Sequence, residues 1–275
     1  MATTWAWPLL FSVGLLASPA SCGPGAATAP PEGLRVMTYN IHFGDPDLSK
    51  IAEVICAAEA DVVALQEVDV HFSERSGFAD QASEIASKCG MEFRYGPIYD
   101  MPPLEPGKPN RQFGPAILTR YPVVSWKNHL LTRLSTQVDA PPTPMTGFLQ
   151  VTLDVGGTEV DVFSTHLDYR RDPAVRKTQV AEMLAILGTP SRPTILMGDM
   201  NAGPAQEELA PLFARLRDAW AGHADPGFTV PVDAPDNRID YVFLGGPIRA
   251  VSARVLDTTA SDHRPVVAEL VFEGR

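Results

Sequence analysis

The sequence predicts an α/β protein in which mixed β-sheets lie inside and helices cover them. Short apolar runs of strand length alternate with segments of helical period. Some of these strands are joined by turns and others by helices, which predicts both antiparallel and parallel pairing. Several strands also end in an acid, an amide or an imidazole. The 275 residues, 45% of them hydrophobic, suit one sizeable domain with a full core.

The first half of the chain predicts three strands and two helices. Asp47 and Asp80 are typical helix N-caps, and Gly90 is a typical residue after a helix end. The apolar run 61–65 indicates a strand that is covered on both faces. We expect strands at 34–39, 61–65 and 93–95, helices at 48–58 and 80–89, and an exposed Pro-rich loop at 100–112 that could line a cleft.

The chain from residue 116 onward predicts a hairpin, two helices and several more strands. Gly156 and Gly157 separate two alternating segments, and the pair Asp172 and Pro173 is typical of a helix start. We expect strands at 116–119, 148–155, 160–163, 193–197, 238–244, 250–256 and 266–270, helices at 172–187 and 207–213, and irregular segments at 140–144 and 218–230.

The N-terminus has the composition of an export signal. Residues 9–17 form an apolar core that is too short to span a membrane comfortably, and small residues follow it. Residues 1–22 are predicted to be a signal peptide, 23–33 a flexible lead-in and 34–275 the folded domain. Lipidation of Cys22 is an alternative, although Pro19 is unusual at such a site. The protein is therefore expected to be secreted, periplasmic or anchored to the envelope.

The other two cysteines, Cys56 and Cys89, lie on separate predicted helices. An exported protein could join them in a disulfide. Two buried free thiols are the alternative that we expect, because buried free cysteine behaves as a small apolar residue.

The formal net charge of −11 argues against tight binding to long nucleic acid, which relies on many Lys and Arg contacts. Neither a Gly-rich phosphate loop nor a Gly-x-Ser-x-Gly motif occurs. P-loop nucleotide hydrolysis and catalysis by a serine nucleophile are therefore not expected.

Polar residues that suit metal-assisted phosphate chemistry stand at the ends of the predicted strands. Carboxylate and amide oxygens are ligands of Mg²⁺, and an imidazole beside a carboxylate can transfer protons. The segment from Gly198 to Asn201 organises this set, because it places an acid and an amide at one sheet edge. The full set is Asn40, Glu67, His166, Asp199, Asn201, Asp240, Asp262 and His263.

With these residues the chain resembles the endonuclease/exonuclease/phosphatase superfamily of metal-dependent hydrolases, which includes DNase I-like nucleases. The matching segments occur in family order from Arg35 to the C-terminus and comprise residues 36–41, 64–68, 165–167, 198–201, 238–241 and 261–265. The resemblance implies a four-layered sandwich of two central sheets flanked by helices. It also implies an active site at one end of the sandwich.

The resemblance assigns the metal site to Glu67, with Asn40 beside it and Asp262 nearby. The implied cofactor is Mg²⁺, with Mn²⁺ as a substitute, and the number of ions stays open. Phosphate contacts from Arg111 and Arg176 are further expectations, with Arg75 a third candidate.

Further roles follow from the same resemblance. His263, oriented by Asp240, is implied to be the general base or a phosphate-polarising group. Asp199 is implied to position the attacking water, and it is the alternative general base. Asn201 would hold the phosphate and orient Asp199, and His166 would donate to a phosphate oxygen.

Two positions depart from the family pattern. Pro115 stands where relatives commonly have an Asn, which removes an amide and a backbone donor. Many small bacterial relatives carry an acidic-x-Arg element in this region, where this chain has only Thr132-Arg133-Leu134.

The function expected from the resemblance is hydrolysis of a phosphoester on a small or lipid-linked substrate, by in-line attack of water. The alternatives are an exported Mg²⁺-dependent nuclease and a non-catalytic binding protein on the same fold. We expect a monomer that contacts a membrane only through an anchor at Cys22.

Overall fold

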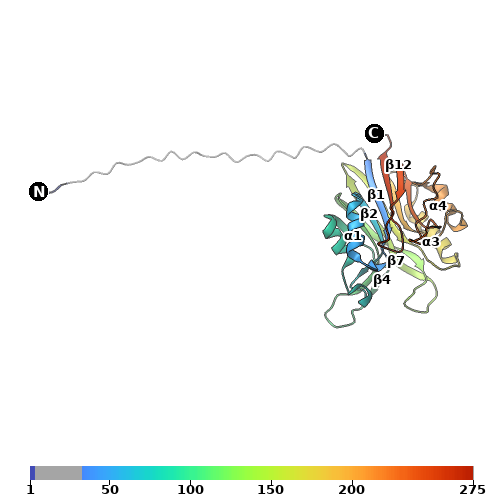
Figure 1. Cartoon of the computed structure of the whole chain (residues 1–275), viewed down its shortest axis with the longest axis horizontal. Coiled ribbons are helices and arrows are strands. Elements are labelled where there is room, and N and C mark those ends of the chain that lie inside the picture. Colours follow the sequence, from blue (N-terminus) through green and yellow to red (C-terminus); the bar gives the residue numbers. More distant parts are fainter. Residues whose placement is uncertain (4–32, 275) are drawn as a thin grey trace.

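The computed structural model describes residues 1–3 and 33–274 (Figure 1). The predicted signal peptide, Cys22 and the lead-in fall almost wholly outside these residues. Within the described part of the chain, the helices are too short or too polar to cross a membrane.

Two β-sheets form the centre of the molecule. Sheet A contains β1 (Gly33–Asn40), β2 (Val62–Val70), β3 (Glu92–Tyr95), β4 (Tyr99–Met101), β5 (Arg111–Thr119), β12 (Ile248–Val255) and β13 (Val266–Phe272). Sheet B contains β6 (Val123–Arg133), β7 (Thr143–Val155), β8 (Thr158–His166), β9 (Thr194–Asp199), β10 (Arg217–Asp218) and β11 (Asp240–Gly245).

The strand order is β12-β13-β1-β2-β5-β3 in sheet A, with β4 paired to β5, and β10-β11-β9-β8-β7-β6 in sheet B. The pairs β1–β2 and β8–β9 are parallel, and each of these pairs is joined through a helix. The other pairings are antiparallel. The sequence prediction of mixed sheets is therefore confirmed.

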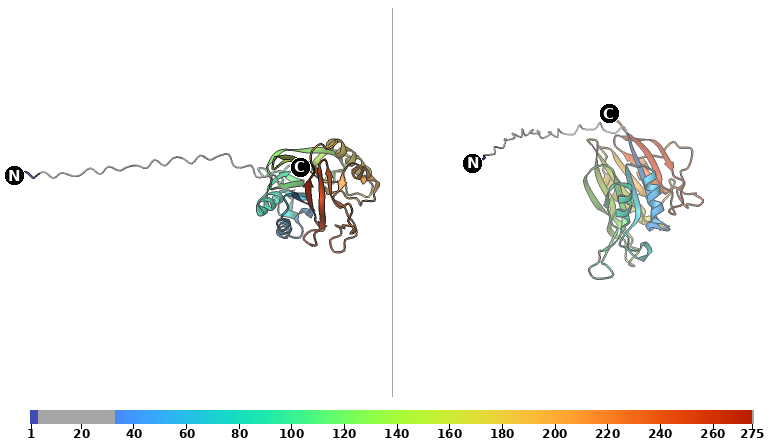
Figure 2. Two further views of the ribbon diagram at one scale, coloured as in Figure 1. Left: turned by 90° about the horizontal axis from the view of Figure 1, so that it is seen from above. Right: turned by 60° about the vertical axis from the view of Figure 1, so that its left-hand side comes forward.

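Helices cover the outer face of each sheet, which completes the predicted four layers (Figures 1 and 2). The helices α1 (Leu48–Ala57) and α2 (Gln81–Cys89) share an apolar cluster with sheet A, and α3 (Ala174–Leu187) and α4 (Ala210–Arg215) share one with sheet B. A third cluster fills the space between the two sheets. In the described part of the chain, three short 3₁₀ helices complete the elements: η1 (His42–Gly44), η2 (Glu74–Ser76) and η3 (Glu207–Leu209).

The residues predicted to cap α1 and α2 and to form the hairpin turn have these roles in the structure. The Asp47 side chain accepts from the Ser49 amide, and the Asp80 side chain accepts from the Ser83 amide. Gly90 ends α2 with φ of 63°, a left-handed conformation that glycine adopts without steric cost. Gly156 and Gly157, with φ of 60° and 85°, form the predicted turn between β7 and β8.

The structure corrects several sequence predictions, including the irregular segment at 140–144, because β7 begins at Thr143. The strand β6 was missed, and the segment predicted as a loop at 100–112 is shorter, because β4 extends to Met101 and β5 begins at Arg111. Cys56 and Cys89 form a disulfide between α1 and α2, so the expectation of two free thiols was wrong. The two helices pack side by side on sheet A, which brings the cysteine Cα atoms to 5.0 Å.

The topology brings the predicted strand ends together. The register pairs Asn40 with Gln66 in sheet A, and in sheet B it pairs Asp199 with both His166 and Asp240. Because the parallel pairs end at the same edge, the polar residues of both sheets meet at the end of the sandwich opposite the C-terminus (Figure 1).

Candidate active site

Glu67 reaches the site through a β-bulge in β2. Leu65 pairs with Ala116 and Val68 pairs with Gly114, so Gln66 and Glu67 together face the single residue Pro115. Glu67 has φ of 58°, which is a left-handed conformation rare for a side chain of this kind. A bulge redirects a side chain and tolerates a proline, which cannot donate to the ladder. The departure at Pro115 is thus accommodated by the same feature that positions Glu67.

Sheet B supplies His166, Asp199 and Asp240 from neighbouring strands. Gly198 precedes Asp199 with φ of 149°, and a Cβ atom there would lie 2.1 Å from the carbonyl oxygen of Thr165. Only glycine permits this close approach of β9 to β8. The glycine of the Gly198–Asn201 segment therefore allows His166 and Asp199 to stand side by side.

Asn40 links the two sheets at the site. Its Nδ2 atom donates to Glu67 Oε1 and to Asp199 Oδ2, both at 3.1 Å. Its Oδ1 atom accepts from the backbone amide of His42 at 3.0 Å, which fixes the orientation of the side-chain amide. One buried amide thus holds two carboxylates from opposite sheets in fixed positions.

Asn201 braces Asp199 from the turn that follows β9. Its backbone amide donates to Asp199 Oδ1 at 2.8 Å, and its Nδ2 atom donates to the carbonyl oxygen of Leu167 at 3.0 Å. Asn201 has φ of 50°, a conformation that Asn adopts more readily than most residues. This geometry fits the predicted role of Asn201 in orienting Asp199.

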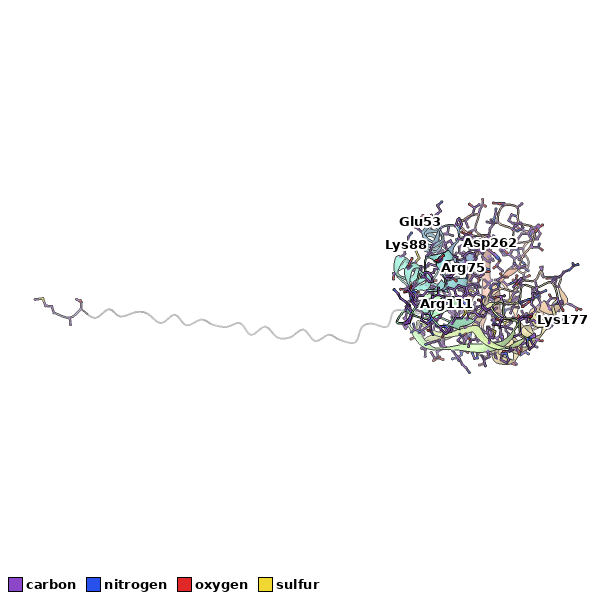
Figure 3. The ribbon with its side chains drawn as sticks, turned by 90° about the horizontal axis from the view of Figure 1, so that it is seen from below. Glu53, Arg75, Lys88, Arg111, Lys177 and Asp262 are labelled. Atoms are coloured by element: carbon purple, nitrogen blue, oxygen red, sulfur yellow. A yellow bond between two sulfur atoms is a disulfide. The ribbon has the colours of Figure 1, made fainter. Side chains whose placement is uncertain are left out.

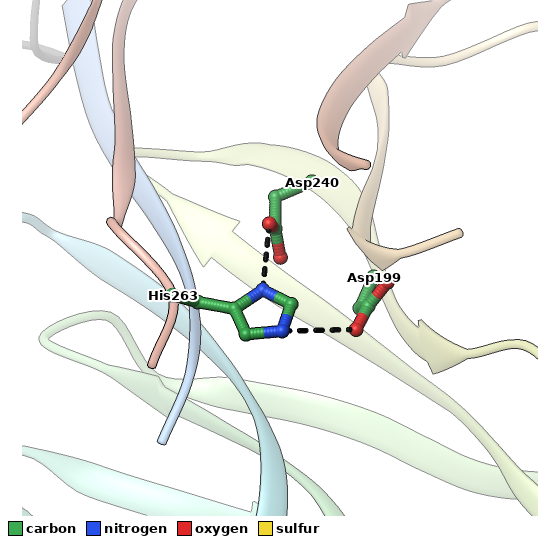
Figure 4. A group of neighbouring side chains, drawn as sticks. All are labelled: Asp199, Asp240 and His263. Atoms are coloured by element: carbon green, nitrogen blue, oxygen red, sulfur yellow. Dashed lines mark hydrogen bonds and ion pairs between the residues drawn. The ribbon is translucent and has the colours of Figure 1, made fainter. Parts of the chain in front are cut away.

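His263 lies between two buried carboxylates (Figure 4). Its Nδ1 atom is 2.9 Å from Asp240 Oδ2, and its Nε2 atom is 3.7 Å from Asp199 Oδ2. Burial lowers the pKa of His263, but the carboxylates of Asp240, Asp199 and Asp262 raise it to a net value of about 10. His166 approaches the same oxygen of Asp199, with Nε2 at 3.5 Å. Two imidazoles therefore converge on Asp199.

Asp262 lies beside this cluster with its side chain about half exposed. Its neighbour Ser261 donates through Oγ to the carbonyl oxygen of Asn40 at 2.9 Å, which ties the segment to the end of β1. His42 Nε2 is 3.9 Å from Asp262 Oδ2. His42 is not among the residues that the sequence assigned to the site, and only the fold reveals its place beside it.

The oxygen atoms of this end of the molecule suit a hard divalent cation. Glu67 Oε2 has no hydrogen-bond partner in the part of the chain that the structure describes, and Asp262 is open to solvent. Carboxylate and amide oxygens are the donors that Mg²⁺ uses in proteins. Glu67, Asn40 and Asp262 therefore fit the metal that the sequence implied.

A second group of ligand-type atoms comes from Asp199, Asp240 and His263, which lie within 4.8 Å of one another. The Nδ1 atom of His263 is already bonded to Asp240, and its Nε2 atom faces Asp199. An imidazole engaged on both sides by carboxylates suits proton transfer and charge stabilisation better than metal ligation.

Arg111 and Arg176, which were predicted to contact the substrate phosphate, have protein partners in the structure. Arg176 is buried and paired with Glu208, and it also donates to the backbone carbonyls of Asp168 and Arg170. Arg111 donates to the carbonyl oxygen of Pro102 and lines a separate groove beside the loop 102–110. Figure 3 labels Arg111, Arg75 and Asp262 in a view of the molecule from below.

Arg133 contributes to the site through the backbone. Its guanidinium donates to the carbonyl oxygens of Thr146, His166 and Gly147 at 2.8–3.0 Å. Burial lowers its pKa to about 10, so it is still charged at neutral pH. Arg133 therefore holds the end of β8, and with it His166, in place.

The family of this chain follows from a match over most of its length. A model of the endonuclease/exonuclease/phosphatase family matches residues 37–263, which include the complete polar cluster. The chain belongs to this family. Members of the endonuclease/exonuclease/phosphatase family are phosphoester hydrolases and are typically dependent on a divalent metal. The resemblance inferred from six short segments is thereby confirmed.

Solved structures of the family share the fold. An endonuclease/exonuclease/phosphatase from Beutenbergia cavernae is 27% identical with a TM-score of 0.71, covering 89% of this chain and 72% of that one. The human Nocturnin catalytic domain with a bound sulfate anion is 22% identical to this chain, with a TM-score of 0.66. The match covers 89% of this chain and 99% of that one. A mannosyl-6-phosphatase from Bacteroides thetaiotaomicron is 19% identical to this chain, with a TM-score of 0.66. The match covers 87% of this chain and 100% of that one.

One curated relative is much longer than this chain. Protein cwh43 of Schizosaccharomyces pombe is 28% identical over 231 residues, which are 82% of this chain and 21% of that protein. The chain therefore spans about a fifth of the length of that relative.

Proposed function

We propose that this family member is an exported, Mg²⁺-dependent hydrolase that cleaves a phosphoester of a small or lipid-linked substrate. The observation that carries the proposal is the convergence of Glu67, Asn40, Asp199, His166 and His263 at one end of the two sheets. Acids, amides and imidazoles at these distances form a site that can bind a metal-associated phosphate and activate water.

The two imidazoles supply hydrogen-bond donors to the phosphate. Both ring nitrogens of His263 face carboxylate oxygens, so the ring is arranged to donate on both sides, as an imidazolium does. His166 presents Nε2 to the same space. We assign both residues to stabilising charge on the non-bridging phosphate oxygens as the reaction proceeds.

Asp199 is the residue that we assign as general base. Asn40 and the amide of Asn201 each donate to one of its carboxylate oxygens, which holds the group rigidly. Asp199 takes a proton from water, the water oxygen forms a bond to phosphorus, and the opposite phosphorus–oxygen bond breaks. The leaving oxygen is protonated from solvent, and no covalent enzyme intermediate forms. Mg²⁺ held by Glu67, Asn40 and Asp262, or Mn²⁺ in its place, would polarise the phosphate.

A small substrate is favoured over a nucleic acid strand. The arginines nearest to the site are already engaged, Arg75 by Asp69, Arg170 by Asp168 and Arg133 by backbone carbonyls. The chain also has a net charge of −11. Binding of a long nucleic acid depends on unpaired cations that can contact several phosphates.

Export is supported by the disulfide between Cys56 and Cys89, because such bonds persist in oxidising compartments. The apolar segment 9–17 gives independent support from the sequence. A lipid anchor at Cys22 would place the domain at a membrane surface, where lipid-linked phosphates are found.

The test is an activity panel on the purified full chain with Mg²⁺, with Mn²⁺ and with EDTA. The substrates are bis-p-nitrophenyl phosphate, p-nitrophenyl phosphate, sugar and inositol phosphates, sphingomyelin and plasmid DNA. We expect metal-dependent release of phosphate or phosphomonoester that is lost in His263→Ala. Cleavage of plasmid alone would support the nuclease, and inactivity on every phosphoester would support the non-catalytic binding protein.

A further inference from the structure

Gln81, the first residue of α2, joins two backbone segments that follow the residues assigned to the metal. Its side chain is buried, with an exposed fraction of 2%. Its Oε1 atom accepts from the backbone amide of Asp69 at 2.9 Å, and its Nε2 atom donates to the carbonyl oxygen of Phe43 at 2.5 Å. Asp69 lies shortly after Glu67 in the chain, and Phe43 lies shortly after Asn40. One side chain therefore connects the segments that follow two proposed metal ligands.

The strand that carries Glu67 continues past the end of its neighbour. The parallel pairing of β1 with β2 ends at Gln66, because β1 itself ends at Asn40. The backbone amide of Asp69 lies beyond this point, and Gln81 supplies its acceptor. A buried backbone amide without an acceptor is costly, so this bond stabilises the position of the strand. The bulge at Glu67 is thus held by β5 on one edge of β2 and by Gln81 on the other.

The turn η1 needs support, because its backbone has an unfavourable conformation. The consecutive residues His42, Phe43 and Gly44 have positive φ angles of 44°, 45° and 83°. Residues other than glycine rarely adopt this conformation, so contacts from the surrounding structure must hold it. The backbone amide of His42 in turn donates to Oδ1 of Asn40 at 3.0 Å. The bond from Gln81 to Phe43 therefore acts, through the turn, on the orientation of the Asn40 amide.

The contact between Gln81 and η1 is close. A Cβ atom at Gly44 would lie 2.5 Å from Gln81 Nε2. The guanidinium of Arg75 covers the ring of Phe43, at 4.1 Å from the ring centroid, and it forms two hydrogen bonds with the carboxylate of Asp69 at 2.7 and 2.9 Å. Phe43 and Asp69 are thus joined through their backbones by Gln81 and through their side chains by Arg75. The two segments cannot shift relative to each other without breaking these contacts.

Sheet B contains a similar bond that does not connect two segments. Asp168 follows His166 in the chain as Asp69 follows Glu67, and its backbone amide donates to Gln179 Oε1 at 2.9 Å. Gln179 is as deeply buried as Gln81, but its Nε2 atom has no partner among the residues that the structure describes. The site residue that precedes this bond is an imidazole rather than an oxygen ligand. Gln179 therefore provides an internal comparison for Gln81.

We propose that Gln81 is a positioning residue for the metal, and that it holds Glu67 and Asn40 in the mutual arrangement in which both can bind one divalent cation. It acts through the backbone at Asp69 and Phe43. Groups that support metal ligands raise metal affinity, because ligands held in place need less ordering when the ion binds. This inference rests on the proposed function, which supplies the metal.

The test measures Mn²⁺ binding to the purified full chain by electron paramagnetic resonance, which does not depend on catalysis. Gln81→Met has a side chain of similar shape and removes both hydrogen bonds. We expect its affinity for Mn²⁺ to be about tenfold weaker than that of the wild type. Gln81→Asn is the more conservative variant, and it should also weaken binding, because its amide is too short to reach both partners. Gln179→Met is the matched control and should bind Mn²⁺ as the wild type does.

Thermal unfolding of each variant without metal would establish that the fold is retained. Wild-type affinity for Mn²⁺ in both Gln81 variants would overturn the inference, and so would an equal loss in Gln179→Met, because Gln81 would then have only a structural role. Absence of Mn²⁺ binding by the wild type would overturn it as well. Binding of Mn²⁺ without cleavage of any phosphoester would count against the proposed function alone, since the Mn²⁺ affinities still decide the role of Gln81.

Discussion

The side-chain amide of Asn40 donates to Glu67 and to Asp199, and it thereby joins carboxylates that belong to different sheets. Each hydrogen bond is 3.1 Å long, and Asn40 and Asp199 are almost completely buried. Two carboxylates at such a separation repel each other unless a donor or a cation stands between them. Asn40 provides the donor, so part of the charge of the site is compensated by the protein itself.

Replacing Asn40 by Asp tests this compensation. The change substitutes a third acid for the shared donor, and we expect the unfolding free energy in EDTA to fall by about 1–3 kcal/mol. Added Mg²⁺ should recover more stability in the variant than in the wild type, because a cation would offset the added charge. Thermal unfolding with and without Mg²⁺ measures both effects.

A matched control for this variant is Asn110→Asp. Asn110 also donates to a carboxylate, that of Asp100 at 2.8 Å, but the pair is exposed. Solvent screens exposed charges, so this change should alter stability little, with or without metal. Equal behaviour of the two variants would contradict the role assigned to Asn40.

The pairing of Asp240 with His263 gives a second prediction. Asp240→Asn preserves the shape of the side chain but removes the charge that orients and supports the imidazole at 2.9 Å. We expect kcat to fall by about 10²–10⁴-fold on whichever phosphoester the wild type cleaves. The exposed Asp236→Asn is the control and should retain full activity. Steady-state kinetics of the two variants would decide, and normal turnover by Asp240→Asn would remove Asp240 from the mechanism.

Much of the candidate site could be predicted because its residues stand at strand ends. The strands that end at Asn40 and His166 are apolar and their parallel partners follow through helices, so the sequence alone places these ends at one edge. The position of Asp240 does not follow from this argument, because Asp240 begins an antiparallel strand. Its role beside His263 was assigned through the family resemblance, and the register with Asp199 explains why Asp240 lies at the same edge.

The sequence alone could not predict which residues contact one another in the folded chain. Nothing near Arg176 in the chain indicates that Glu208, 32 residues later, neutralises it. The strand β6 was missed because it is an edge strand, and its exposed residues outnumber its buried ones. Gln179 is one polar residue of a predicted helix, and only the packing of α3 against the segment at Asp168 buries it.

The environment of His129, away from the site, predicts a dependence of stability on pH. Burial lowers the pKa of His129, and so does Lys127, while the hydrogen bond to Gln150 opposes this shift. Because the folded-state pKa lies below the unfolded value, this contribution to stability is complete above about pH 6.5 and declines as the pH falls through the folded-state pKa. His129→Gln should therefore lose less unfolding free energy than the wild type between about pH 7 and pH 5. Urea unfolding at both values measures the difference, and an identical loss in the two proteins would contradict the prediction.

The disulfide between Cys56 and Cys89 should matter for stability and not for catalysis. It closes a chain segment with a sequence separation of 33 and joins α1 to α2 on the outer face of sheet A. Limiting the unfolded chain in this way typically contributes about 2–4 kcal/mol. The double variant Cys56→Ala, Cys89→Ala should lose about this amount in urea unfolding, whereas its kcat/KM at a temperature where it is folded should equal that of the wild type. The wild type under reducing conditions serves as a second comparison. A large loss of activity in a folded double variant would mean that the pairing of α1 and α2 also positions the strand ends of sheet A.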